Sequence, residues 1–127
     1  MLGMDEWTVA DHLRDMPAES VALYERFVEL VAAHGPFTYR VTKTMITVKG
    51  VRRGFAGARP TSRGLAGYFD IQRVVTDPRI LRADPYTMRL YVHQFRITAP
   101  EQLDETFAGW LGEAYRVGAG DHLAAPA

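Results

Sequence analysis

Cysteine is absent from this sequence of 127 residues. Without thiols the chain can form neither disulfides nor thiolate metal clusters, and a cysteine nucleophile is excluded. Long apolar runs are also missing: no stretch approaches the roughly 18 residues that a membrane-spanning helix needs, and residues 1–16 contain no apolar signal region. We therefore expect a cytoplasmic protein that has no membrane partner.

Serine is scarce, and the histidines form no recognisable motif. Ser20 is expected in the first turn of a helix and Ser62 in a tight turn, where local hydrogen bonding accounts for each. The histidines show no i,i+4 pair and no H-E-x-x-H motif; they are His12, His34, His93 and His122. Because the glycines also match no nucleotide-binding spacing, the sequence predicts no serine triad, no metal site and no cofactor.

The remaining composition is that of an ordinary globular protein, with 47% hydrophobic and 24% charged residues. A chain of this length buries one core. We expect a single domain over residues 1–118. A flexible tail is expected over 119–127, where the helical periodicity of the preceding segment has ended.

The net charge is zero, but the charges are segregated along the chain. Residues 1–36 carry two arginines and seven acidic side chains, a net −5, and residues 99–127 carry one arginine and five acidic side chains, a net −4. Residues 37–98 carry twelve lysines and arginines against three aspartates, a net +9. We call residues 37–98 the basic segment; an acidic segment flanks it on each side.

The two acidic segments have the periodicity of amphipathic helices. Thr8 with Asp11 predicts a capping box for a short first helix, and Pro17 suits the first turn of a longer second helix. A third helix is predicted to start at Thr98, with Glu101 completing a capping box. These helices present apolar faces that must pack on another layer.

The basic segment has the pattern of β-strands joined by turns. The predicted strands are residues 37–41, 44–49, 55–59, 65–71 and 86–97, while residues 77–85 are expected to form a loop or a single helical turn. The fold class is therefore α+β. We expect a single domain with an antiparallel four- to five-stranded sheet and the N-terminal and C-terminal helices packed on one face, in the order α-α-β-β-β-β-α.

Small residues gather at the predicted centre of this sheet. If residues 60–63 form a hairpin loop, Gly57 lies opposite Ala66 and Ala56 lies opposite Gly67. The surface there is expected to be shallow. It is explained either by a closely approaching helix or by the floor of a ligand pocket.

The pocket interpretation gives candidate functional residues. The ligand-binding candidates are Lys43, Arg59, Tyr68 and Tyr91, of which the two cations would neutralise an anion; His93 is the catalytic candidate, as an acid or base. Two alternatives stay open: Lys43 as a solvated charge at a strand end, and His93 as a hydrogen-bonded residue of the core. A functional pocket requires Lys43 and His93 to come within hydrogen-bonding distance of each other.

Short motifs run through nearly the whole chain. They are Asp11-His12-Leu13, Ala22-Leu23-Tyr24-Glu25-Arg26-Phe27, Thr42-Lys43-Thr44-Met45-Ile46, Gly54-Phe55-Ala56, Asp77-Pro78-Arg79, Leu103-Asp104, Trp110-Leu111 and Ala114-Tyr115. On these motifs the chain resembles the uncharacterised bacterial and archaeal family catalogued as domain of unknown function 5655. His93 matches a histidine that this family tends to place on its last strand. The resemblance implies a domain that stands alone or is fused to other modules, nuclease-like ones included, and it implies no established activity.

The excess of cations in the basic segment favours a binding module for an anion, either a phosphate- or carboxylate-bearing metabolite or a nucleic-acid backbone. One alternative is a small cofactor-free enzyme, of isomerase, cyclase or lyase type, that uses His93 as acid or base. A second alternative is a protein-interaction adaptor. The third is a solvated sheet whose arginines pair with the acidic helices, so the direction in which the basic side chains point decides between these hypotheses.

Overall fold

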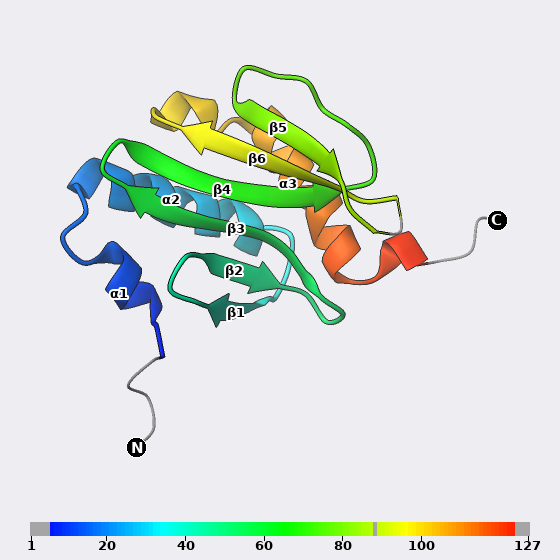
Figure 1. The fold of residues 1–127 in the computed structure, drawn as a ribbon, viewed down its shortest axis with the longest axis horizontal. Helices are drawn as coiled ribbons and strands as arrows, with labels where there is room; N and C mark the ends of the chain where they lie inside the picture. Colours follow the sequence, from blue (N-terminus) through cyan, green and yellow to red (C-terminus); the bar gives the residue numbers. More distant parts are fainter. Residues whose placement is uncertain (1–5, 88, 124–127) are drawn as a thin grey trace.

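The computed structural model describes residues 6–87 and 89–123. Within them the chain forms three α-helices, six β-strands and two 3₁₀ turns: α1 (Val9–Leu13), α2 (Ala18–Ala32), β1 (Thr38–Val41), β2 (Ile46–Lys49), β3 (Gly54–Thr61), β4 (Gly64–Ile71), β5 (Ile80–Pro85), β6 (Tyr91–Ile97), η1 (Pro100–Gln102), α3 (Glu105–Gly118) and η2 (Asp121–Leu123). The strands form one antiparallel sheet in the order β1-β2-β3-β4-β6-β5 (Figure 1). The predicted α+β fold class is confirmed.

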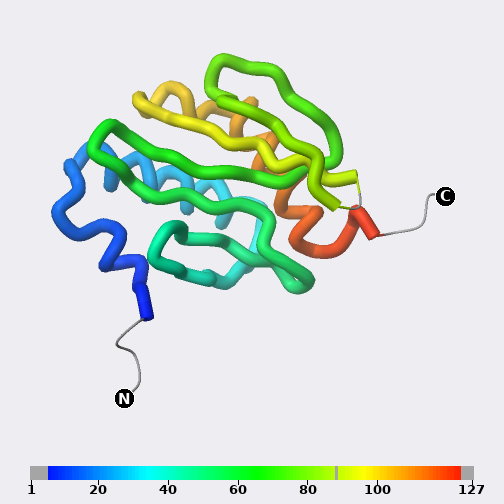
Figure 2. Tube along the Cα trace, viewed as in Figure 1, coloured from blue at the N-terminus to red at the C-terminus, as the bar shows by residue number. Residues whose placement is uncertain are grey.

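The molecule has two layers, a sheet and a layer of helices (Figures 1 and 2). In the view of Figure 1 the strands lie in front, and α2 and α3 run behind them. Both helices contact the central strands β3 and β4. No helix of the described residues covers the side of the sheet that faces the viewer, and we call this side the helix-free face.

Aromatic side chains fill the space between the sheet and the helices. Phe69 of β4 is fully buried, and its ring centre lies 5.7 Å from that of Trp110 and 6.0 Å from that of Phe107, both on α3. Phe95 of β6 approaches Phe27 of α2 with ring centres 6.1 Å apart. Since complete burial of such a side chain contributes about 1.5–3 kcal/mol, this aromatic layer fixes which face of the sheet is the hydrophobic one.

The helix starts follow local capping chemistry. The capping box of α1 is confirmed, because Thr8 and Asp11 exchange backbone-to-side-chain hydrogen bonds of 2.9 and 3.1 Å. The predicted start of the third helix at Thr98 is wrong. The Gln102 side chain instead accepts from the Thr98 N–H at 2.7 Å and closes the η1 turn, and α3 begins after Asp104, whose carboxylate caps it.

The sheet has six strands, not four or five, because Ile80–Pro85 forms β5 where a loop or helical turn was expected. This strand lies at the sheet edge and pairs only with β6. Charged side chains and a terminal proline are tolerated at such an edge, and they hide the strand pattern in the sequence. The last strand is correspondingly shorter than predicted: β6 begins at Tyr91, and before it the Tyr86 N–H donates to the Leu90 carbonyl oxygen.

The β3–β4 hairpin has a different register from the predicted one. Ser62 and Arg63 form a two-residue turn, so Gly57 lies opposite Tyr68 and not opposite Ala66. Gly64 begins β4 with φ +145°, a conformation that favours glycine, which explains why the turn ends there. Because the shift is two residues, every side chain keeps the face that the predicted register gave it.

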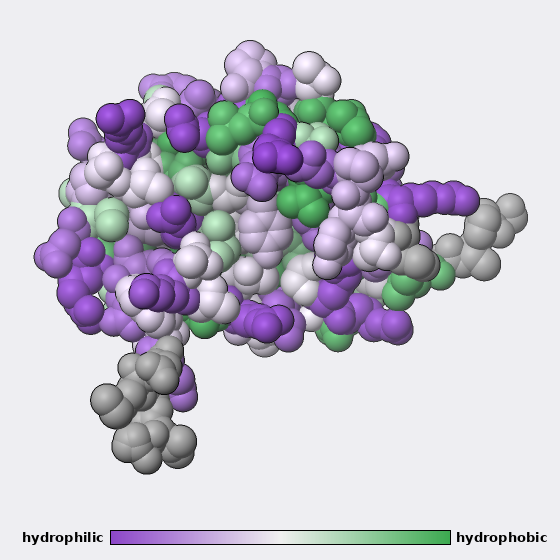
Figure 3. Space-filling model, viewed as in Figure 1, coloured by the Kyte–Doolittle hydropathy of each residue, from purple (hydrophilic) through white to green (hydrophobic). Residues whose placement is uncertain are grey.

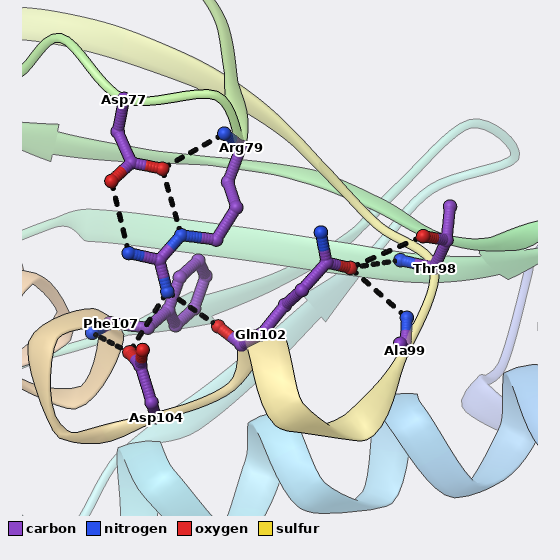
Figure 4. Close-up of polar contacts among 7 residues, drawn as sticks. All are labelled: Asp77, Arg79, Thr98, Ala99, Gln102, Asp104 and Phe107. Atoms are coloured by element: carbon purple, nitrogen blue, oxygen red, sulfur yellow. Dashed lines mark hydrogen bonds and ion pairs between the residues drawn. The ribbon is translucent and has the colours of Figure 1, made fainter.

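Arg79 joins the loop before β5 to the start of α3 (Figure 4). Its guanidinium donates to both carboxylate oxygens of Asp77, at 2.9 and 3.1 Å, and to Asp104 at 2.9 Å. The same group lies 4.8 Å from the centre of the Trp110 ring. Hydrogen bonding to Asp77 is the main cause that raises the pKa of Arg79, and it also lowers the pKa of Asp77. Arg79 thus brings residues of three of the quoted motifs into contact, those that contain Asp77, Asp104 and Trp110.

The C-terminal segment lies partly outside the described residues. Residues 121–123, expected to belong to a flexible tail, form the η2 turn, and residues 124–127 are not among those described. The domain limits of 1–118 stay a prediction. No helix in residues 6–87 and 89–123 has the length and apolar character needed to cross a membrane.

Two glycines of α3 test the packing of this helix on the sheet. A Cβ at Gly118 would collide with the Phe55 ring, whereas a Cβ at Gly109 would meet nothing within 4 Å. We expect Gly118→Ala to lower the free energy of unfolding by about 1–3 kcal/mol through overpacking. Gly109→Ala should raise it by about 0.5–1 kcal/mol, because alanine loses less backbone entropy in a helix.

Urea unfolding followed by far-UV circular dichroism measures both changes. Since both substitutions lie in one helix and add one methyl group, each is the control for the other. Equal effects of the two substitutions would contradict the close approach of α3 to Phe55.

Candidate functional site: a basic pocket on the helix-free face

Two arginines with an alanine between them form a row across three strands of the helix-free face. Arg59 of β3 is paired with Ala66 of β4, and Ala66 is paired with Arg96 of β6. Directly paired residues point to the same face, and strands roughly 4.8 Å apart place the two arginine Cα atoms about 10 Å from each other. The short Ala66 side chain therefore leaves a gap between two guanidinium groups.

A hollow of about 260 Å³ opens at this row. It is lined by Arg59, Thr61, Ser62, Arg63, Leu65, Ala66 and Arg96. A third arginine reaches it because Arg63 belongs to the β3–β4 turn. In Figure 3 this end of the sheet, at the left of the view, carries hydrophilic side chains around paler ones. We call this hollow the basic pocket.

Four other arginines of the basic segment have acidic partners, whereas Arg40 and Arg52 have none among the described residues. Arg53 pairs with Asp70 at 2.7 Å, Arg73 with Glu113 at 2.7 Å, Arg79 with Asp77 and Asp104 at 2.9 Å, and Arg82 with Asp84 at 2.7 Å. By contrast, Arg59, Arg63 and Arg96 form no ion pair with any described residue. The positive charge of the basic pocket is therefore not neutralised by a direct partner among these residues.

A second row crosses all six strands of the same face. Its members are Arg40, Thr47, Gly57, Tyr68, Gln94 and Arg82. The Tyr68 hydroxyl lies 2.9 Å from the Thr47 hydroxyl, and the ring passes so close to Gly57 that a Cβ there would be only 2.7 Å from it. Burial is the main cause that raises the pKa of Tyr68. This row separates the basic pocket from the other end of the face.

Asp70 of β4 lies at that other end, four residues or roughly 13 Å along the strand from Ala66. Its side chain is only 5% exposed, and one carboxylate oxygen accepts from Arg53 at 2.7 Å. The other oxygen is buried without a hydrogen-bond partner among the described residues. Burial raises the pKa of Asp70 to about 6, and Arg53 opposes this effect only in part. The helix-free face thus has a positive end and an end with a buried acid.

The sequence-predicted site residues are divided between different parts of the molecule. Arg59 lines the basic pocket, and Tyr68 lies on the same helix-free face. Lys43 is exposed in the turn between β1 and β2. Tyr91 shares the face of His93 at alternate positions of β6, on the helix-covered side of the sheet. The predicted convergence of Lys43 and His93 therefore does not occur.

His93 is a hydrogen-bonded residue of the core. It is completely buried, and its ring stacks on Phe69 with centres 5.0 Å apart. Nε2 accepts from the Val75 N–H at 2.9 Å, so the imidazole is neutral and Nδ1 donates to the Tyr91 carbonyl oxygen at 3.0 Å. Burial is the main cause that lowers the pKa of His93. These contacts support the core alternative and offer no support for an acid or base.

Sequence reasoning missed Arg63, Arg96 and Ala66 as members of a site. Alternation along the last strand already put Arg96 on the face opposite to His93. What the sequence did not provide was the hairpin register, since Ala66 was placed opposite Gly57 and not opposite Arg59. As for metals, no group of three or more ligating side chains occurs in the part of the chain that the structure describes.

Asp70 makes the stability of the protein depend on pH. Its pKa rises from 3.8 in the unfolded chain to about 6 in the folded protein, so the folded state binds more protons between these values. The corresponding stability is complete below about pH 4 and is lost as the pH rises through 6, with a magnitude on the order of 3 kcal/mol. We expect Asp70→Asn to remove this decrease.

Urea unfolding at pH 4.5 and 7.5 measures this effect, and carboxyl ¹³C NMR gives the pKa of Asp70 directly. Asp84→Asn, on the neighbouring half-exposed carboxyl of β5, is the control and should keep the decrease. A carboxyl resonance of Asp70 that titrates below pH 4 would show that this carboxyl is not held in the described environment.

Comparison with known proteins gives a family but no activity. No curated protein and no solved structure matches the chain. The model of one family, the Domain of unknown function (DUF5655), matches residues 9–118. This range runs from the first residue of α1 to the last residue of α3 and includes the whole sheet. The resemblance seen in the sequence motifs is therefore confirmed, and the chain belongs to the DUF5655 family.

Proposed function

We propose that the protein is a binding module for a small anionic metabolite, which it holds in the basic pocket by a phosphate or carboxylate group between Arg59 and Arg96. The observation that carries this proposal is the gathering of Arg59, Arg63 and Arg96 around one hollow without an acidic partner among the described residues. Guanidinium groups bind phosphate and carboxylate through paired, charge-assisted hydrogen bonds, which makes arginine the best-suited side chain for such a site.

The pairing of the neighbouring arginines supports this interpretation. Arg53, Arg73, Arg79 and Arg82 each have a carboxylate within 3 Å. A solvated sheet whose arginines all pair with acidic groups would leave no cluster without partners. Arg40 on the same face also forms no ion pair with a described residue, but it lies in the second row and does not line the hollow. In the basic pocket three such cations meet, and a ligand anion is the partner that fits them.

A small ligand fits the face better than a nucleic-acid backbone does. Binding of a single-stranded nucleic acid uses cations along the path of the backbone and aromatic side chains on which the bases stack. Here the middle of the face is the neutral pair Thr47 and Tyr68, and the far end carries Asp70 and Asp84. The positive charge is concentrated at one end, over an area that suits one anionic group.

Substitution of the arginines tests the site. With pyrophosphate as the probe in titration calorimetry at low salt, Arg59→Gln and Arg96→Gln should each raise the dissociation constant about tenfold or more, because each removes a charge-assisted hydrogen bond. Arg116→Gln, at an exposed arginine of α3, is the matched control and should leave binding unchanged. Equal effects of all three substitutions, or no binding by the wild-type protein, would reject the pocket.

A matched pair at Ala66 tests the same geometry through charge alone. Ala66→Glu places a carboxylate between Arg59 and Arg96, whereas Ala66→Gln adds a neutral side chain of the same size. We expect the glutamate variant to bind no pyrophosphate and to be more stable than the glutamine variant by about 0.5–1 kcal/mol. Variants that are equal in both stability and binding would refute the row geometry.

A single-stranded oligonucleotide of mixed sequence separates the two kinds of anion. If it binds more tightly than pyrophosphate, and Arg40→Gln weakens it as much as Arg59→Gln does, the ligand follows the whole face and the small-metabolite proposal is overturned. Under the proposal, the oligonucleotide binds more weakly, and Arg40→Gln has no effect on pyrophosphate.

A further inference from the structure

A second hollow lies at the end of the molecule where α2 begins. At the left of Figure 1 the start of α2 lies beside the β3–β4 turn and the η1 turn. Residues of these three parts enclose a volume of about 450 Å³, which is in the range of small-molecule sites. Its walls contain more apolar than polar surface, so the hollow differs in character from the basic pocket.

The first turn of α2 has no side-chain cap. The residue in the N-cap position is Pro17, which provides no capping hydrogen bond. The N–H groups of Ala18, Glu19 and Ser20 therefore find no acceptor among the described residues. In a helix of 15 residues these N–H groups carry the positive end of the helix dipole, equivalent to about half an elementary charge. Oxygen anions are the ligands that such a terminus favours.

Ser20 gives an independent indication of a ligand. Its side chain lines the hollow, although the residue is only 3% exposed. Sequence reasoning explained this serine by helix capping, but Pro17 occupies the cap and the Ser20 hydroxyl has no hydrogen-bond partner among the described residues. A serine hydroxyl at the wall of the hollow can donate a hydrogen bond to a ligand oxygen.

The charges around the hollow limit the charge of its ligand. Arg63 of the β3–β4 turn contributes one positive charge, and the helix start adds about one half. The Glu19 carboxylate, which also lines the hollow, subtracts one. The remaining positive charge is small and suits one negative charge, while a doubly charged phosphate would be repelled by Glu19. Apolar contacts are available from Leu23 and Pro100.

We propose that the hollow at the start of α2 binds a small monocarboxylic acid, with its carboxylate at the N–H groups of residues 18–20 and the Ser20 hydroxyl, and with its apolar body against Leu23 and Pro100. The two hollows are neighbours that share Ser62 and Arg63, but only the basic pocket is lined by Arg59 and Arg96 and has no carboxylate in its lining. The proposed carboxylate site has its own donors, the helix start and Ser20, and therefore does not require the proposed metabolite site.

Titration of ¹⁵N-labelled protein with hexanoate tests the proposal by NMR. The amide resonances of Ala18, Glu19 and Ser20 should move together and saturate at a common dissociation constant. Ser20→Ala should raise that constant by about twofold to tenfold, because one hydrogen bond is lost. Glu19→Gln should lower it severalfold, because a repulsive charge is removed. Hexan-1-ol, which lacks the carboxylate, is the control probe and should not shift these amide resonances.

Two variants keep this test separate from the basic pocket. Glu25→Gln removes an exposed carboxylate of the same helix that does not line the hollow, and it should not change hexanoate binding. Arg59→Gln should weaken pyrophosphate binding and leave hexanoate binding unchanged. The proposal is overturned if hexanoate leaves amides 18–20 unshifted, if hexan-1-ol shifts them equally, or if Glu19→Gln fails to strengthen binding. The Glu19→Gln result decides the question even if Ser20→Ala impairs folding.

Discussion

The sheet of this protein packs on one side only, and the positions of the other features follow from this constraint. α2 and α3 cover one face, where Phe69 and Phe95 meet the aromatic residues of α3. Such packing contributes about 1.5–3 kcal/mol for each large side chain and leaves no room on that face for a solvated site. His93 is held there with both ring nitrogens bonded. The candidate sites with polar and charged side chains consequently lie on the helix-free face and at the ends of the sheet.

Some arginines of the basic segment form ion pairs that hold the fold together, while those of the basic pocket form none with a described residue. Arg79 connects Asp77 and Asp104 and stacks on Trp110, and Arg73 reaches Glu113 of α3, so these side chains hold the helix layer and the loop before β5 together. Arg59, Arg63 and Arg96 have no such role among the described residues. A net charge of zero for the chain therefore conceals a local excess at one end of one face.

The sequence predicted the features that depend on local chemistry. The Thr8–Asp11 capping box, the helix that starts after Pro17 and the antiparallel sheet were all recognisable from short-range patterns. β5 was missed because an edge strand need not be apolar, and Arg82 with Asp84 resembles a loop.

The candidate site was only half predictable, because it depends on register. Arg59 and Tyr68 were both named as ligand-binding candidates, and they lie on one face of the sheet, since alternation along a strand is local. The meeting of Arg59 with Arg96 across Ala66 depends on where the β3–β4 turn is placed and on β6 pairing with β4, and both are set by long-range packing. Lys43 and His93 were grouped by residue type, but Lys43 lies in the exposed turn between β1 and β2 and His93 is buried on β6.

The central claim is that this domain binds an anionic ligand in the basic pocket. The most direct measurement is an NMR map of the ¹⁵N-labelled protein titrated with pyrophosphate, with both backbone amides and arginine Nε resonances observed. The account predicts that the largest shifts fall on the Nε groups of Arg59, Arg63 and Arg96 and on the amide of Ala66, with one common dissociation constant. Shifts centred on Arg40, Lys49 or Arg82, or no saturable shift at the three pocket arginines, would contradict it.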